Sequence, residues 1–179
     1  MKRLTVVLVA ALAVGALTGQ ALAGGGGLKP VSPTVAKQIA ADGPYPASSV
    51  GISLYSDTVT STRGAVIQKR GCAQTNYFPR NSRAVFRMWA VDGKTGQPIT
   101  DADVQYVYIK IPGLPNQALT WGGHGSGASK VYFWSLGWGV PVDYPLGAVN
   151  FRIVLKTTDG RFGVYTQPQV DGSQMTVTT

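Results

Sequence analysis

Apolar and polar residues alternate with a period of two in short runs that begin near Ser49. The clearest run is 84–91, in which the even-numbered residues are apolar and Arg87 and Trp89 lie on the opposite face. A second run, 148–156, has apolar residues at its odd-numbered positions. A period of two is typical of a strand with one face in a core and one face toward water. These runs therefore predict strands and not helices.

Short strands separated by turn signals predict the fold class. Gly-containing turns separate the runs, and the chain lacks Glu, so that all eight acidic residues are Asp. Low Glu content with abundant Thr, Val, Tyr and Gly disfavours helices and favours strands. Many short strands at regular spacing are typical of an antiparallel sandwich or barrel. We therefore expect an all-β protein, a single antiparallel β-sandwich of about 7–9 strands. The further predicted strands are 50–55, 65–68, 104–111, 118–121, 130–135, 162–166 and 174–178.

The first residues have the pattern of a secretion signal. Lys2 and Arg3 precede an apolar stretch at 4–17, and Ala21-Leu22-Ala23 forms an A-x-A cleavage site. The apolar stretch is too short for a retained membrane span, and no later stretch is long and apolar enough to be one. Residues 1–23 are therefore predicted to be a signal peptide, and the mature protein to be periplasmic or extracellular.

A Gly/Pro-rich arm, 24–48, is predicted to follow the signal. Its four leading glycines favour flexibility. Within it, 35–41 is compatible with a short helical turn capped by Thr34 or Ser32. Such an arm either remains disordered or docks on a neighbour, and it could complete a neighbour's sheet.

Two segments carry a resemblance to a known class of domain. Residues 86–104, FRMWAVDGKTGQPITDADV, resemble the strand–turn–strand unit of bacterial Ig-like domains. Residues 142–161, VDYPLGAVNFRIVLKTTDGR, are similar to a later strand-and-turn pattern of the same class. The resemblance implies an Ig-like or fibronectin-III-like sandwich over 49–179, with a hairpin joining neighbouring strands within 86–104. It implies no activity, because this fold hosts many functions, and the Cys…Trp…Cys core of antibody domains is absent.

Aromatic and basic residues on non-core strand positions predict a binding surface. Arg87 and Trp89 share one such face, and Tyr106, Tyr108 and Lys110 share a face of the next predicted strand. Tyr, Trp and Arg dominate the energetics of protein–protein interfaces. The same face could stack against sugar rings, or it could be buried against the other sheet or the arm. We expect a non-catalytic, exported binding or assembly module whose partner is another exported protein, including a second copy of itself.

The formal net charge of +8 favours acidic surfaces or partners. The basic residues are spread along the chain and form neither a dense stripe nor a recognisable nucleic-acid-binding module. Nucleic-acid binding is therefore not predicted.

The single cysteine and the single histidine define an alternative function. Cys72 follows the predicted strand 65–68, and His124 lies in a Gly-rich segment predicted to be a loop. Cys72 is open to three interpretations: a buried small hydrophobe, an intermolecular disulfide, or a ligand to copper, haem or another soft metal. His124 is either an exposed loop residue or a second ligand beside Cys72. A blue-copper site is excluded because it needs two histidines. What remains is an exported redox accessory that binds metal or haem through Cys72 and His124, or that offers a ligand to a cytochrome-like partner.

Catalysis has little support in the sequence. One histidine and no Glu leave few general acid–base candidates. Asp101 and Asp103 form a close carboxylate pair, but the turn that contains them explains both. No G-x-S-x-G elbow is present. The protein is not predicted to be an enzyme.

Overall fold

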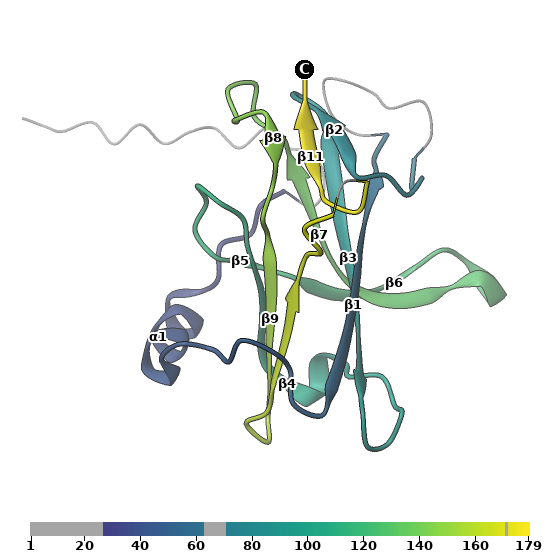
Figure 1. The fold of residues 1–179 in the computed structure, drawn as a ribbon. Coiled ribbons are helices and arrows are strands. Elements are labelled where there is room, and N and C mark those ends of the chain that lie inside the picture. Colours follow the sequence, from purple (N-terminus) through teal and green to yellow (C-terminus); the bar gives the residue numbers. More distant parts are fainter. Residues whose placement is uncertain (1–26, 63–70, 171) are drawn as a thin grey trace, which may run out of the picture.

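The alternating runs fold into strands of a β-sandwich-like structure in the computed structural model, which describes residues 27–62, 71–170 and 172–179 (Figure 1). The predicted signal peptide, 1–23, and the predicted strand 65–68 lie outside the described residues. Within the described part of the chain, no helix has the length and apolar character needed to cross a membrane.

The strands of the described residues form three sheets. The first, called the β3 sheet, has the order β1 (Ile52–Thr60), β3 (Arg83–Asp92), β7 (Val131–Gly139), β6 (Thr120–His124). The second, called the β4 sheet, has the order β10 (Phe162–Thr166), β9 (Arg152–Thr157), β4 (Val104–Lys110), β5 (Gln117–Ala118). A small third sheet has the order β2 (Tyr77–Pro79), β11 (Thr176–Thr178), β8 (Gly147–Ala148). All pairings are antiparallel except that of β2 with β11.

The β3 and β4 sheets pack face to face, and the small sheet lies at one end of them (Figure 1). Even-numbered residues of β3 point into the core, as the alternation predicts: Phe86 and Met88 are fully buried. Ile153 and Leu155 reach the same core from β9. Below, the outer face of each sheet means the face turned away from the other sheet.

The segment 86–104 does not join two neighbouring strands of one sheet, as the resemblance implies. A short hairpin is present, in which Val91 pairs with Pro98 and the Ile99 amide donates a 2.8 Å hydrogen bond to the Ala90 carbonyl. The segment leaves β3, contributes the buried Ile99 to the core, and enters β4 in the other sheet. A short 3₁₀ turn, Asp101–Asp103, ends the crossing. In it the Thr100 hydroxyl and the Asp103 carboxylate form a reciprocal capping box. The crossing separates two strands that the resemblance implies to be neighbours.

The predicted strand 148–156 is interrupted. Residues 147–148 form β8 in the small sheet, and regular pairing in the β4 sheet begins only at Arg152. Between them, Val149 and Phe151 keep the predicted inward orientation and are buried. The alternation therefore correctly predicts which residues enter the core between the two large sheets, although the backbone changes its partner sheet.

The arm contributes the single α-helix of the described residues, α1 (Pro33–Asp42). The Ser32 hydroxyl accepts a hydrogen bond from the Val35 amide at 3.2 Å, and Pro33 occupies the first turn, where no amide donor is needed. The chain leaves the helix through Gly43 at a φ of 72°, which suits glycine. The helical turn predicted at 35–41 is therefore confirmed, with Ser32 as its cap, and it packs on its own chain.

Candidate binding surface on the β3 sheet

The residues predicted to form one binding face lie on two opposite faces. Arg87 and Trp89 belong to the outer face of the β3 sheet, whereas Tyr106, Tyr108 and Lys110 belong to the outer face of the β4 sheet. Because the inner faces of the two sheets share one core, their outer faces point in opposite directions. A single partner surface made of all these residues is therefore excluded.

Two of these residues are covered by the arm. Tyr106 and Tyr108 are 6% and 2% exposed and pack, with Val154, against the underside of α1. The Tyr106 hydroxyl donates a 2.7 Å hydrogen bond to Asp42 at the end of the helix. Burial raises the pKa of Tyr108 to about 12. The expectation that these two tyrosines are exposed to a partner is wrong, because the apolar stripe of α1 occupies their face.

The outer face of the β3 sheet carries an ordered group of polar and aromatic side chains around Arg87. Arg87 forms an ion pair with Asp57 of β1, in which the distance from Arg87 Nε to Asp57 Oδ1 is 2.8 Å. Its guanidinium carbon lies 5.4 Å from the ring centroid of Trp89 and 5.7 Å from that of Phe133. Hydrogen bonds to Asp57 raise the pKa of Arg87 above its ordinary value, and the charge of Asp57 acts in the same direction. These contacts hold the guanidinium in place above two aromatic rings.

His124 extends this group to the edge of the sheet. It ends β6, with Val131 of β7 as its Cα partner, so the predicted Gly-rich loop is in fact a strand at this point. The imidazole stacks on Phe133 with 4.0 Å between ring centroids and 8° between ring planes. Partial desolvation of the ring, together with the positive charge of Arg87, lowers the pKa of His124, although the residue is exposed. The imidazole is therefore neutral near pH 7.

A groove of about 600 Å³ runs along this face, and we call it the Cys72 groove. Its volume falls within the range of about 300–1,000 Å³ that is usual for ligand sites. Cys72 is exposed, and its backbone has a φ of 60°. The interpretation of Cys72 as a buried hydrophobe is therefore wrong. Although 52 residues apart in sequence, Cys72 and His124 lie in the wall of the same groove. The lining residues are Val59, Thr60, Ser61, Thr62, Gly71, Cys72, Arg83, Val85, Arg87, His124, Gly125, Ser129, Val131 and Phe133.

A second hollow, of about 510 Å³, lies on the other side of the hairpin formed by β6 and β7. We call it the Trp121 hollow: Trp121 and Tyr132 line it from the hairpin, and Trp89 and Pro98 from β3 and the crossing segment. Trp121 stacks on Tyr132 at 6.1 Å between ring centroids. Tyr132 is not among the candidate surface residues predicted from the sequence. Its position next to Phe133 in a predicted strand places the two rings on opposite faces, and this was the signal that could have identified it.

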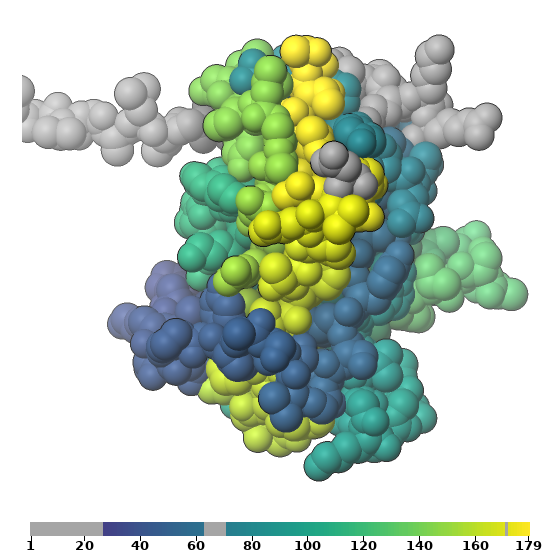
Figure 2. All heavy atoms as spheres, viewed as in Figure 1, coloured from purple at the N-terminus to yellow at the C-terminus, as the bar shows by residue number. Residues whose placement is uncertain are grey.

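The β6–β7 hairpin projects from the body of the molecule (Figures 1 and 2). Because side chains alternate between the faces of a strand, the hairpin presents one row to each hollow. His124, Val131 and Phe133 line the Cys72 groove, whereas Trp121 and Tyr132 line the Trp121 hollow. Both faces of the projecting hairpin therefore border a hollow.

The strand edges of the two large sheets differ in their cover. At β5, the backbone carbonyl of Lys29 accepts a 2.6 Å hydrogen bond from Ala118, and at β10 the hydroxyl of Ser49 bonds both backbone groups of Val164. At β1, residues 72–75 pair with the second half of the strand. Among the described residues, no segment pairs with the outer edge of β6. Natural sheets usually protect their edge strands. Among the four edges compared here, β6 is therefore the exception, and we call its outer edge open.

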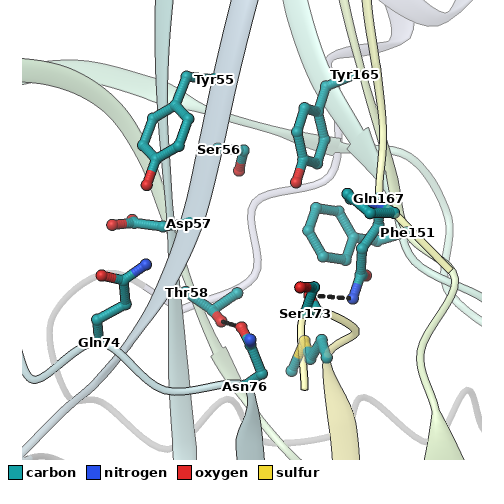
Figure 3. A pocket seen from close by; sticks show the side chains of 12 residues that line it. Tyr55, Ser56, Asp57, Thr58, Gln74, Asn76, Phe151, Tyr165, Gln167 and Ser173 are labelled. Carbon is teal, nitrogen blue, oxygen red and sulfur yellow. Dashed lines mark hydrogen bonds between the residues drawn. The ribbon is translucent and has the colours of Figure 1, made fainter. Parts of the chain in front are cut away.

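A polar cleft of about 200 Å³ separates the edge strands β1 and β10 (Figure 3). Figure 3 shows Tyr55 and Asp57 on one side and Tyr165 across from them. Asp57 is already paired with Arg87. The cleft is smaller than the usual ligand site of about 300–1,000 Å³. It is therefore a weaker candidate than either hollow at the hairpin.

The part of the chain that the structure describes contains no cluster of metal-ligating side chains. No group of three or more His, Cys, Asp or Glu side chains is placed there to hold a metal ion. Asp103 accepts hydrogen bonds from the amide and hydroxyl of Thr100, and these bonds lower its pKa. Asp103 therefore has the turn role that the sequence predicts.

Comparisons with known proteins identify no relative. No protein-family model matches the chain, and neither the curated proteins nor the solved structures contain a significant match. The argument for function therefore rests on the residues and geometry of the surface itself.

Proposed function

We propose that the protein is an exported, non-catalytic binding module that docks a partner protein on the β6–β7 hairpin and the adjoining outer face of the β3 sheet. One observation carries the proposal: the hairpin has an open strand edge with a hollow on each of its two faces. This arrangement matches the way an extended peptide binds when it adds a strand to a sheet.

Strand addition explains both hollows at once. An added strand would pair its backbone with the outer edge of β6 and place successive side chains on alternate sides of the hairpin. One set of side chains would then enter the Cys72 groove and the other the Trp121 hollow. Val131 and Tyr132, adjacent in sequence and 53% and 49% exposed, face these opposite sides and offer apolar contacts to each set.

The side chains around the hairpin are suited to tight contact. Trp89, Trp121 and Arg87 belong to the residue types that most often dominate interfaces. Arg87 is already held by Asp57 and by two rings, so a partner need not fix its rotamer on binding. Without Lys2 and Arg3 of the predicted signal peptide, the formal net charge falls from +8 to 8 − 2 = +6, which favours an acidic partner. The partner is therefore an acidic exported protein with an extended segment that carries apolar side chains on both faces.

The single cysteine allows a direct search for this partner. A photo-crosslinker attached to Cys72 on the native protein should capture a protein that lies in the Cys72 groove. The matched control carries Cys72→Ser with Lys37→Cys on α1, and it should not capture the same protein.

Variants of the hairpin then test the assignment on the captured partner. Trp89→Ala with Arg87→Ala should weaken binding by about 30-fold or more, as expected for interface hot spots. Gly122→Lys places a charge at the β6 edge, where an added Cβ meets nothing within 4 Å, and it should also weaken binding. Ala36→Lys, on the exposed side of α1, serves as the control and should leave the Kd unchanged. If the hairpin variants bind as well as the control, the interface is elsewhere.

The placement of Cys72 and His124 in one groove favours a second candidate function, binding of copper or haem in a redox accessory. A thiolate and an imidazole are suitable ligands for Cu(I), and the lowered pKa of His124 keeps the imidazole in the neutral form that ligation requires. Titration of the reduced protein with Cu(I), and an absorption spectrum with haem, test this function. One equivalent of Cu(I) lost in both Cys72→Ser and His124→Gln would support it, and an unchanged titration would exclude it.

A further inference from the structure

The outer face of the β4 sheet contains a second feature, independent of the hairpin. The strand register arranges its residues in rows across β10, β9 and β4. The first row is Phe162, Lys156 and Tyr106; the second is Val164, Val154 and Tyr108; the third is Thr166, Arg152 and Lys110. Helix α1 and Tyr45 pack on the first two rows. The third row lies beyond this cover, and Arg152 and Lys110 are exposed.

The charges of these rows are balanced differently. In the first row, Lys156 forms an ion pair with Asp42 at the end of α1, and the Tyr106 hydroxyl bonds the same carboxylate. In the third row, two cations are direct cross-strand partners, Lys110 with Arg152. Like charges directly opposite each other destabilise a sheet. Within the described residues, neither cation has an acidic partner.

The two cations line a groove of about 410 Å³, called here the Lys110 groove. Its other walls are Tyr45, Pro112, Asn150 and Gln169, and none of the acidic side chains that the structure describes lines it. The carbonyl oxygen of Asn150 accepts a hydrogen bond from Gln174 at 2.7 Å, which leaves the amide N–H groups of Asn150 as donors. Tyr45 and Pro112 add an apolar wall. The groove therefore combines two positive charges, a neutral donor and an apolar surface.

We propose that the Lys110 groove binds the phosphate group of a small organic phosphate ester, with Lys110 and Arg152 bridged by the phosphate. A phosphate monoester carries a charge of about −1.5 to −2 near pH 7, which matches two cations better than the single charge of a carboxylate. A guanidinium binds phosphate oxygens in a bidentate manner, and an ammonium contributes a point charge. The volume of the groove leaves room for an organic body against Tyr45 and Pro112.

The test measures binding to the mature protein at constant ionic strength. The probes are glucose 6-phosphate, inorganic phosphate and glucose, followed by calorimetry and by the shifts of amide resonances. We expect saturable binding of the phosphate-bearing probes and none of glucose. Tighter binding of the ester than of inorganic phosphate would show that the organic body is recognised; equal affinity would show that the phosphate alone is bound and would overturn the assignment to an ester.

Charge-matched variants locate the site. Lys110→Gln with Arg152→Gln should weaken binding by at least about tenfold, as expected when charge-assisted hydrogen bonds are removed. Lys37→Gln with Lys94→Gln removes the same charge elsewhere and should change affinity by less than about twofold, a non-specific charge effect. Saturable binding retained in the first variant, or no binding by the unaltered protein, would overturn the proposal.

Thermal unfolding without ligand shows that the variant is folded. Removing two opposed like charges should keep or raise the Tm. Adding glucose 6-phosphate should raise the Tm of the unaltered protein, because a ligand that binds only the folded state stabilises it, but not the Tm of the variant. A Tm that rises equally in both proteins would contradict the site.

Discussion

The outer faces of the two large sheets carry similar aromatic and basic residues, but they differ in how far these residues are exposed. On the β4 sheet, Tyr106, Tyr108 and Val154 are buried because α1 packs on them. On the β3 sheet, Trp89 remains partly exposed and lines the Trp121 hollow. The arm of the chain thus covers the outer face of the β4 sheet and leaves the outer face of the β3 sheet uncovered.

The difference also extends to charge. The acid that neutralises Lys156 comes from α1, whereas the acid that neutralises Arg87 comes from the adjacent strand β1. A cation whose acidic partner lies in the same sheet needs no covering helix to neutralise its charge. The face that carries such a cation can therefore remain open. This contrast shows that aromatic and basic residues on a strand do not by themselves identify a binding face.

The largest expected effect comes from the docking stripe of α1. Val35→Asp with Ile39→Asp should lower the free energy of unfolding by about 2–4 kcal/mol, because both side chains pack on the buried tyrosines. Ala36→Asp with Ala40→Asp, on the exposed side, should cost about 1 kcal/mol through helix propensity alone. Urea denaturation measures both. Equal losses would mean that α1 does not cover the β4 sheet.

A matched pair of valines compares the two faces directly. Val154 is 0% exposed beneath α1, whereas Val85 lies partly exposed in the Cys72 groove. Val154→Thr should cost about 1–3 kcal/mol, the usual result of burying a hydroxyl without a partner. Val85→Thr should change stability by less than about 0.5 kcal/mol. A larger loss at Val85 would reverse the assignment of the covered and open faces.

Alkaline pH should weaken the covered face. Burial raises the pKa of Tyr108 to about 12, and the unfolded chain ionises near its ordinary value of about 10. The stability that depends on the neutral phenol is therefore complete below pH about 10 and is lost as the pH rises toward about 12. Tyr108→Phe should therefore lose less stability over this interval than the unaltered protein.

The smallest effect belongs to His124 on the open face. Its pKa is lowered, so the unfolded chain takes up a proton first as the pH falls below the ordinary value of about 6.5. Stability should therefore decline from about pH 6.5 down to the lowered pKa of the folded protein. Denaturation at pH 7.5 and pH 5 should show a smaller decline in His124→Gln. An identical decline would mean that the stacked ring carries no penalty for its charge.

The sequence predicts the strands and their buried faces because a period of two is a local property. The alternation in 84–91 correctly assigns Phe86 and Met88 to the core, and Ser32 marks the start of α1. It does not predict which sheet a strand joins, because the turn after β3 resembles a hairpin but crosses between the sheets.

The candidate site depends on contacts between distant segments. Arg87 and Trp89 are correctly predicted to face away from the core, yet no local pattern shows that α1 covers Tyr106 and leaves Trp89 open. The same limit applies to Cys72, whose exposure depends on where residues 72–75 pair with β1. Long-range packing, and not periodicity, decides which face is available.

Hydrogen exchange of the complex with the captured partner tests the central claim most directly. Strand addition at the open edge should slow exchange of the amides in β6, Thr120–His124, and leave α1, Pro33–Asp42, unchanged. Slowed exchange confined to α1, or absent from β6, would contradict the assignment of the β3 sheet as the binding face.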